Sequence, residues 1–323
     1  VYRAVTPCVA HPPGHNLGSG EDRRRGWLAS SPMGGLMSRS VMITGGASGI
    51  GRALARRLAD RGDRLTLADI DAEGLAAVQA ELAPLAQAQG GDVSAVVLDV
   101  RNGDELRAVV DRLADAQGGL DIIVNNAGIG TGGPVEELEF EHWQRVFDIN
   151  LTGVMHGTAA AYPRMVAAGH GHIVNIASLA GLVPAPFLAP YCAAKHGVVG
   201  LSLSLAAEAS GTGVAVTCVC PGFTETPILD SEGPADLSRT SMSGRGRVMA
   251  EALPGGVYEV EKLARDIERA IDKRTVILVT PRSARLLWLA ARVAPRRGVM
   301  IAGRLARRTR AELAARLSAT QGA

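Results

Sequence analysis

Three side chains between residues 178 and 195 have the types and the spacing needed for proton transfer. Tyr191 and Lys195 stand four residues apart in a segment that reads as helix, so their side chains share one helix face. A free phenol, with a pKa of about 10, is a poor acid or base at neutral pH, but a nearby cation favours the phenolate and lowers that pKa. Ser178 follows an apolar run, residues 173–177, that reads as a buried strand, and open α/β sheets bind ligands at this carboxyl edge. The segment therefore predicts a site for acid–base chemistry.

Taken singly, each of these three residues has a structural explanation. A Tyr at a helix start usually packs, a Lys is usually solvated, and a Ser after a strand usually forms a turn. Chemistry is favoured only where the chain also provides an independent cofactor motif.

A glycine-rich turn, Thr44–Gly51, provides such a motif between an apolar run at 41–43 and a helix that reads on to Arg61. Glycines let the backbone approach a pyrophosphate at the helix N-terminus. The spacing is GxxxGxG rather than GxGxxG, and a tight structural turn is the alternative.

An acid follows this turn at the distance expected for ribose recognition. Asp69 lies eighteen residues beyond Gly51 and closes the second apolar run, where a carboxylate would bind the adenosine ribose. The carboxylate would repel a 2′-phosphate, and no Arg or Lys follows it directly, which favours NAD over NADP. The alternative is that Asp69 is the N-cap of the next helix.

Polar residues also follow the third and fourth apolar runs. Asp99 and Val100 end the third run, and Asn125–Gly128 ends the fourth, so both groups are expected at the same carboxyl edge. A helix cap and an Asn/Gly turn are the alternatives. Asn150 stands in the middle of a long predicted helix, where Asn-Leu-Thr-Gly is unfavourable. We predict a local helix irregularity with a functional amide there, and a solvent-facing Asn is the alternative.

The elements that must position these residues alternate between short apolar runs and helices. The predicted strands are 41–43, 64–68, 93–98, 120–124, 173–177, 214–219 and 276–279. The predicted helices after the first are 72–85, 104–116, 140–168, 190–209 and 260–271, and 223–256 reads as a polar loop. This order predicts an α/β fold: one doubly wound Rossmann domain over 37–281, with about seven parallel strands and helices on both faces.

The two ends of the chain differ from this domain. Residues 1–36 contain Pro and Gly without periodicity or a secretory apolar core, so we expect a disordered extension, and Met37 could be the native start. From residue 281 onward there are ten Arg and one Glu, whereas residues 37–280 hold 20 basic and 29 acidic side chains. Residues 282–323 therefore predict a basic helical extension, with helices at 283–293 and 299–317. Such helices could contact an anionic membrane or nucleic acid, or could dock on the acidic domain or a neighbouring subunit.

Composition restricts the remaining classes of function. The chain has 323 residues, 47% hydrophobic and 20% charged, which suits a soluble globular protein with a sizeable core. Aromatic residues are only 3%, which argues against stacking platforms for single-stranded nucleic acid. No apolar run approaches the roughly 20 residues of a membrane-spanning helix. The four cysteines (Cys8, Cys192, Cys218 and Cys220) fit neither a disulfide nor a zinc pattern, so we expect no metal and a reducing, cytoplasmic location.

Together, the motifs resemble the short-chain dehydrogenase/reductase family over about residues 40–280. Thr44–Gly51 fits the family's TGxxxGIG turn, Asn125–Gly128 fits its NNAG motif, and Pro221-Gly222 followed by Thr226 fits its PG motif. The residues that fit its catalytic tetrad are Asn150, Ser178, Tyr191 and Lys195.

The resemblance implies an oxidoreductase that moves a hydride between NAD(H) and the carbinol or carbonyl carbon of an alcohol or ketone. It implies that Tyr191 is the general acid/base, that Ser178 binds the substrate oxygen, and that Lys195 binds the ribose and lowers the pKa of Tyr191. Asn150 would hold a water in a proton relay. The implied cofactor-binding residues are Gly45, Ser48, Gly49, Ile50, Gly51, Asp69, Asp99, Val100, Asn126, Ala127, Gly128, Tyr191, Lys195, Pro221, Gly222, Thr224 and Thr226.

Substrate and assembly are less constrained. Segments 179–190 and 223–256 would hold the substrate, and Leu182, Val183, Phe187 and Leu188 favour a hydrophobic one, although they could equally be packing residues. The resemblance also implies a homo-oligomer, a dimer or tetramer, through helices 140–168 and 190–209. The rival interpretations are an NADP-dependent ketoreductase of acyl thioesters, against which Asp69 argues, and a non-catalytic dinucleotide-binding scaffold, against which the intact tetrad argues.

Overall fold

The structure is a computed structural model that describes residues 38–116, 119–251 and 256–321. The extension predicted at 1–36, with Cys8, lies outside the described residues.

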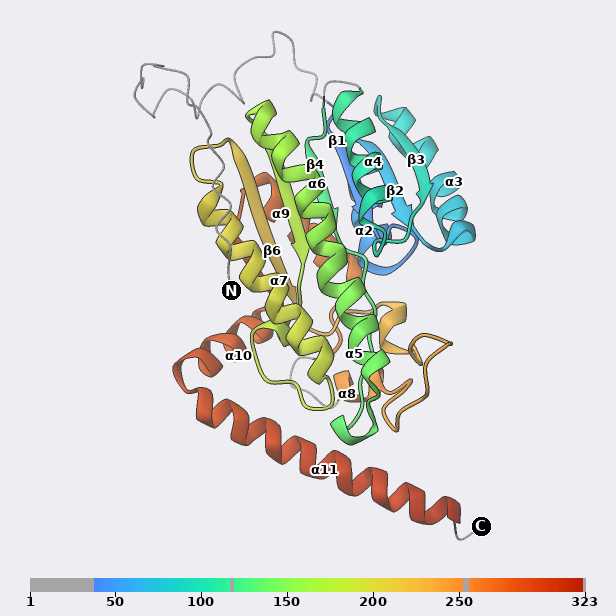
Figure 1. The fold of residues 1–323 in the computed structure, drawn as a ribbon, viewed down its shortest axis with the longest axis vertical. Helices are drawn as coiled ribbons and strands as arrows, with labels where there is room; N and C mark the ends of the chain where they lie inside the picture. Colours follow the sequence, from blue (N-terminus) through green and yellow to red (C-terminus); the bar gives the residue numbers. More distant parts are fainter. Residues whose placement is uncertain (1–37, 117–118, 252–255, 322–323) are drawn as a thin grey trace, which may run out of the picture. The chain divides into compact units, whose positions relative to one another are not determined.

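A seven-stranded parallel sheet forms the centre of the domain, in the order β3-β2-β1-β4-β5-β6-β7 (Figure 1). The strands are β1 Ser40–Thr44, β2 Arg64–Asp69, β3 Asp92–Val97, β4 Ile122–Asn125, β5 Gly171–Ile176, β6 Val214–Pro221 and β7 Ile277–Thr280. The strand order reverses between β1 and β4, and parallel sheets of this kind bind ligands at that point of their carboxyl edge. The register pairs Thr44 with Ala68 and Ile43 with Val124, so β1, β2 and β4 end near one another.

Helices cover both faces of the sheet. They are α2 Gly49–Ala59, α3 Ala72–Ala88, α4 Gly103–Asp115, α5 Phe140–Phe147, α6 Gly153–Ala168, α7 Ala189–Glu208, α8 Gly246–Glu251, α9 Val260–Asp272, α10 Arg282–Val293 and α11 Pro295–Gln321. Buried side chains of α2, α3 and α9 form one core layer, and those of α4, α6 and α7 form another. The predicted doubly wound α/β domain and helical C-terminal region are therefore confirmed.

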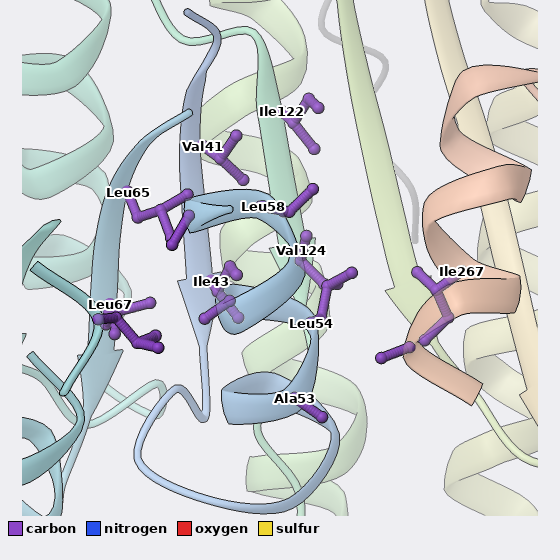
Figure 2. Packing of buried hydrophobic residues seen from close by; sticks show 14 of the residues in the cluster. Val41, Ile43, Ala53, Leu54, Leu58, Leu65, Leu67, Ile122, Val124 and Ile267 are labelled. Carbon is purple, nitrogen blue, oxygen red and sulfur yellow. The ribbon is translucent and has the colours of Figure 1, made fainter. Parts of the chain in front are cut away.

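The side chains of β1 point alternately to the two faces of the sheet, and both sets include buried apolar residues, so both faces must be covered. Val41 and Ile43 belong to the α2 side of the sheet, whereas Met42 belongs to the opposite side. Figure 2 shows Leu54 and Leu58, one helical turn apart on α2, packed over β1 and β4. Both leucines are fully buried, and burying such a side chain contributes about 1.5–3 kcal/mol. The same helix that seals this core begins at the glycine-rich turn.

Two elements differ from the sequence prediction. The helix expected over 140–168 is divided by a π-helical turn, Asp148–Thr152, between α5 and α6. Helix α8 lies within the segment 223–256 that was predicted as a polar loop, because its six residues are too few for a clear periodicity. Cys218 and Cys220 are buried, whereas Cys192 is half-buried. Within the described part of the chain, every helix is too short or too polar to cross a membrane.

Candidate active site

The turn between β1 and α2 leaves the start of α2 open. Gly45 and Gly49 have φ values of 69° and 52°, the left-handed region that favours glycine. A Cβ on Gly51 would lie 2.1 Å from the carbonyl oxygen of Gly45, so only glycine fits there. Ser48 occupies the N-cap position, and no side chain caps the helix. Uncapped N–H groups and the positive end of the helix dipole suit a phosphate, so this turn fits a dinucleotide pyrophosphate.

Asp69 lies at the end of β2 and is half-buried against this turn. Its Oδ2 accepts a hydrogen bond from the N–H of Ala47 at 3.0 Å, and its Oδ1 accepts one from the N–H of Asp71 at 3.2 Å. The N-cap of α3 is Asp71, which accepts from the N–H of Gly74 at 3.0 Å. The alternative in which Asp69 caps the helix is therefore wrong, and its carboxylate lies beside the cofactor turn.

Asp99 and Val100 follow β3 at the same edge. The Asp99 carboxylate pairs with the guanidinium of Arg101 at 2.6 Å, and this hydrogen bond holds the pKa of Asp99 below its usual value. Asn102 rather than Asp99 caps α4, since it accepts from the N–H of Glu105 at 3.2 Å. The helix-cap alternative for Asp99 is therefore wrong.

Asn126 joins the loop after β4 to the loop after β1. Its side-chain Nδ2 donates to the carbonyl oxygens of Thr44 at 2.9 Å and Gly45 at 3.0 Å. The Thr44 hydroxyl accepts from the N–H groups of Asn126 at 3.0 Å and Ala127 at 3.2 Å. The neighbouring Asn125 is instead buried in the core, where its Nδ2 donates to Asn175 Oδ1 at 2.8 Å. The motif is therefore more than a simple Asn/Gly turn.

Asn150 is fully buried in the π-helical turn between α5 and α6. Its Oδ1 accepts from the N–H of Ile129 at 2.8 Å, and its Nδ2 donates to the carbonyl oxygen of the same residue at 2.9 Å. The predicted irregularity is confirmed, and a solvent-facing Asn150 is wrong. A Cβ on Gly128 would lie 2.8 Å from Asn150 Oδ1 and 3.7 Å from Lys195 Nζ, so this glycine fits between the two side chains.

Tyr191 and Lys195 lie in the first turns of α7. Lys195 is buried, its Nζ donates to the carbonyl oxygen of Ile176 at 2.8 Å, and it lies 5.7 Å from the centre of the Tyr191 ring. Ser178 follows β5, and its hydroxyl accepts from the N–H of Ala180 at 3.1 Å. Ser178, Tyr191 and Lys195 therefore lie at the carboxyl end of β5, and Gly128 lies between Lys195 and Asn150. The four residues of the predicted tetrad thus gather at one end of the sheet.

The electrostatics of this pair differ from the sequence prediction. Burial raises the pKa of Tyr191 to about 12, although the neighbouring Ser178 hydroxyl lowers it in part. Burial also lowers the pKa of Lys195 to about 8. The pKa of Tyr191 is therefore raised rather than lowered as predicted, because loss of hydration dominates. The Nζ of Lys195 donates to the carbonyl oxygen of Ile176.

The segment after β6 lies against the cofactor turn. Pro221 ends β6, and the N–H of Gly222 donates to the carbonyl oxygen of Thr280 at 2.8 Å. The Thr224 hydroxyl donates to the carbonyl oxygen of Gly222 at 3.1 Å. A Cβ on Gly49 would lie 3.2 Å from Thr226 Cγ2, so Thr226 packs on the start of α2.

Comparison with known proteins decides the family. A sequence profile of short chain dehydrogenases matches residues 39–236. The chain belongs to the short-chain dehydrogenase/reductase family. D-beta-hydroxybutyrate dehydrogenase of Rhizobium meliloti (strain 1021) is 37% identical over 221 residues, which cover 68% of this chain and 84% of that relative.

Two solved structures extend the comparison to the fold. A short-chain dehydrogenase/reductase from Burkholderia phymatum in complex with NAD has 33% identity and a TM-score of 0.71, over 79% of this chain and 93% of that one. A short-chain dehydrogenase from Sphingobium yanoikuyae in complex with NADPH has 32% identity and a TM-score of 0.66, over 81% of this chain and 95% of that one. The resemblance expected from the motifs is therefore confirmed: this short-chain dehydrogenase is an NAD(P)-dependent oxidoreductase of the alcohol–carbonyl type.

The two loops predicted to hold the substrate in this short-chain dehydrogenase are each hydrogen-bonded to the Gly132–Gly133 segment. Val183 and Phe187 are buried, so they act as packing residues, whereas Leu182 and Leu188 remain half-buried. The carbonyl oxygen of Phe187 accepts from the N–H of Gly133 at 2.7 Å. The Thr240 hydroxyl donates to the carbonyl oxygen of Gly132 at 2.5 Å. Segment 131–133 was not among the predicted site residues, although its Gly-Gly pair was an available signal.

Two further contacts were also not foreseen. The guanidinium of Arg310 on α11 pairs with Glu136 at 2.5 Å and lies 5.7 Å from the centre of the Phe187 ring, and no local pattern links residues so distant in sequence. Among the described residues of this short-chain dehydrogenase, no group of three or more His, Cys, Asp or Glu side chains is placed to hold a metal ion.

Proposed function

We propose that the chain is an NAD-dependent dehydrogenase of hydrophobic alcohols. The observation that carries the proposal is the carboxylate of Asp69, which lies beside the cofactor turn and is fixed by the N–H of Ala47 at 3.0 Å. A carboxylate there accepts hydrogen bonds from ribose hydroxyls and repels the 2′-phosphate of NADP. The next residues, Ile70 and Asp71, add no positive charge.

The remaining cofactor contacts follow from the same edge of the sheet. The open start of α2 would hold the pyrophosphate, and Asp99 and Val100 would border the adenine. Lys195 would bind the nicotinamide ribose. The other residues proposed to line the cofactor are Gly45, Ser48, Gly49, Ile50, Gly51, Asn126, Ala127, Gly128, Tyr191, Pro221, Gly222, Thr224 and Thr226.

In the proposed oxidation, the alcohol loses a hydride from its carbon and a proton from its oxygen. The bound nicotinamide ring supplies the hydride acceptor and, in its oxidised form, a positive charge. Tyr191 takes the hydroxyl proton as phenolate, and Ser178 donates a hydrogen bond to the substrate oxygen. Positive charge beside a buried phenol lowers its pKa, which opposes the effect of burial. We assign Asn150 a positioning role, since both polar atoms of its amide bind Ile129, and a water relay through it stays a prediction.

The test is calorimetric titration with NAD and NADP of the wild type, Asp69→Ala and Asp71→Ala. We expect the wild type to prefer NAD and Asp69→Ala to bind NAD roughly 10–100-fold more weakly, since hydrogen bonds to a charged group contribute about 1.5–3 kcal/mol. Asp71→Ala is the matched control, because it removes a neighbouring carboxylate that only caps α3. A wild-type preference for NADP would contradict the assignment, and binding of neither would favour a protein that acts without this cofactor.

A second candidate is NADPH-dependent reduction of a carbonyl such as an acyl thioester's, and one observation favours this direction. With a pKa raised to about 12 by burial, Tyr191 is protonated at neutral pH and can donate to a carbonyl oxygen. Initial rates with matched alcohol and ketone pairs, each with NAD(H) and NADP(H), distinguish the two directions. Turnover of either kind would exclude the scaffold interpretation.

We also propose a homo-oligomer through α5, α6 and α7. Large apolar side chains are exposed on all three: Phe140 is 73% exposed, Met155 47% and Leu203 40%. An apolar pocket of about 470 Å³ lies at α5, lined by Leu138, Phe140, Trp143, Gln144 and Phe147. None of these five is a predicted site residue, and exposed apolar surface of this kind is typical of subunit interfaces.

A further inference from the structure

Helices α10 and α11 combine positive charge with exposed apolar side chains. Between residues 282 and 313 the chain has nine Arg and one Glu. Seventeen large hydrophobic residues are exposed in the described part of the chain, and seven of them lie on these two helices. The seven are Leu286, Leu287, Leu289, Val293, Val299, Met300 and Ile301.

The apolar residues of α10 share a face that points away from the domain. Leu286, Leu289 and Val293 follow the i, i+3, i+7 spacing of one helix face and are 67%, 44% and 85% exposed. Ala284, on the other side of the helix, is buried. Arg292 borders the exposed face and lies 5.9 Å from the centre of the Trp288 ring. The apolar side chains of α10 therefore face solvent rather than the core.

Helix α11 also carries exposed apolar and basic side chains. Figure 1 shows it as a long helix that follows α10. Met300 is 59% exposed and shares one side of the helix, at i−3, i+4 and i+8 spacing, with Arg297, Arg304 and Arg308. Among the nine arginines between residues 282 and 313, whose side chains the structure describes, Arg310 makes the one ion pair. The other eight are left without a carboxylate partner there.

We propose that the exposed face of α10 and α11 binds an anionic phospholipid surface. Arginines beside leucines on a helix that lies in the interface plane place the guanidinium groups among the lipid phosphates and the apolar side chains among the acyl chains. Nucleic acid would match the charge, but it would leave the seven apolar side chains in water. The contact is peripheral, since neither helix can span a bilayer.

The test is co-sedimentation of the full chain with vesicles of phosphatidylcholine alone and of phosphatidylcholine mixed with phosphatidylglycerol. We expect binding to the mixed vesicles only, weakened by added salt because screening reduces the attraction. Each arginine near an anionic surface changes affinity on the order of fivefold, so Arg297→Glu/Arg304→Glu/Arg308→Glu should bind on the order of a hundredfold more weakly. Leu286→Ser/Leu289→Ser/Val293→Ser should also lose binding.

Matched controls are taken from α4 and β3, outside the proposed binding face. Arg107→Glu reverses an exposed arginine of α4, and Val97→Ser removes an exposed apolar side chain of β3, so both should bind vesicles like the wild type. Cofactor titration of every variant checks that the domain is folded. Equal partitioning of the wild type to neutral and mixed vesicles, or unchanged binding by both triple variants, would overturn the proposal. A dimer that the leucine variant loses in sedimentation velocity, without any vesicle binding by the wild type, would assign this face to a second copy instead.

Discussion

At the scale of single residues, the side chains of the candidate site are held mainly by backbone atoms. Asn126 binds the carbonyl of Thr44, Asn150 binds both backbone groups of Ile129, and Lys195 binds the carbonyl of Ile176. Each of these bonds ties a side chain of the candidate site to a backbone group of a neighbouring segment. The geometry of the site therefore depends on loops keeping their backbone positions.

Tyr191→Phe tests the proposed acid–base group directly. Removal of the hydroxyl should lower kcat by about 10²–10⁴-fold, the usual contribution of general acid–base catalysis. NAD affinity should remain within a few fold, because the ring stays in place. Tyr162→Phe is the control, since Tyr162 is a half-buried packing residue on α6. Steady-state kinetics and calorimetry measure both quantities, and an active Tyr191→Phe enzyme would contradict the assignment.

Gly128→Ala tests the close approach of the loop after β4 to the tetrad. The added Cβ would lie 2.8 Å from Asn150 Oδ1, closer than real Cβ contacts come, so either Asn150 or the loop must move. We expect a loss in kcat of at least tenfold, since small misplacements of reacting groups are costly. Gly200→Ala is the matched control, because a Cβ there meets no atom within 4 Å. Equal kcat for the two variants would exclude a positioning role for Gly128.

At the scale of elements, the π-helical turn at Asp148–Thr152 is connected to the loop after β4 through one amide. Asn150→Ala would leave the N–H and carbonyl of Ile129 without their partners, and each unsatisfied buried group costs about 1–3 kcal/mol. We expect the free energy of unfolding in urea to fall by roughly 2–5 kcal/mol. Gln144→Ala, which removes an exposed amide on α5, should change it little. Similar values for both variants would show that the turn does not depend on Asn150.

The β5–β6 pair carries a pH-dependent contribution to stability. His172 is buried on β5, its Nε2 lies 2.8 Å from the Thr217 hydroxyl, and burial lowers its pKa from 6.5 to about 4. Between these two values the unfolded chain binds a proton that the folded chain does not, so the stabilisation present above pH 6.5 is lost as pH falls.

The expected size of this loss is on the order of 3 kcal/mol across that window, at 1.36 kcal/mol for each pH unit. Urea unfolding of the wild type and His172→Gln at pH 7 and pH 4.5 measures it, and the variant should show the smaller drop. His196→Gln, which changes an exposed histidine of α7, should behave like the wild type. If the free energy of unfolding of His172→Gln fell more than that of the wild type between pH 7 and pH 4.5, a group other than His172 would cause the loss.

Much of the element order could be predicted from local patterns. The seven apolar runs became the seven strands, because a buried parallel strand needs continuous apolar residues, and Asn-Leu-Thr-Gly in a helix indicated the π turn at Asn150. The order β3-β2-β1-β4-β5-β6-β7 was not predicted, because no local pattern specifies which strands are neighbours.

Properties that depend on burial and distant contacts could not be predicted in this way. The pKa of Tyr191 is raised because the surrounding chain removes water from the phenol. The four-residue spacing to Lys195 carries no information about that burial. The pairing of Arg310 with Glu136 joins residues 174 positions apart. Site residues could be named from motifs, but their protonation states required the packed structure.

At the scale of the whole molecule, the proposed assembly predicts a change in mass. Leu203→Glu and Met155→Glu introduce charges on the exposed faces of α7 and α6, and burying an unpaired carboxylate at an interface is strongly unfavourable. We expect sedimentation velocity to show a dimer or tetramer for the wild type and smaller species for the variants. Val97→Glu, a comparable change on the exposed side of β3, should keep the wild-type mass. A wild type that sediments as a monomer would contradict the oligomer.

The hydrogen bonds around the site form two separate groups, and protein engineering can use that separation. Asn126 joins the β1 turn to the loop after β4, whereas Thr240, Gly132 and the carbonyl of Phe187 belong to the loops proposed to face the substrate. Within the described residues, no hydrogen bond joins the Asn126 group to the Thr240 group. A library randomised at 182–188 and 227–245 should therefore yield new substrate preferences while nucleotide affinity stays near the parental value. Selection for a new cofactor could proceed independently at 69–71.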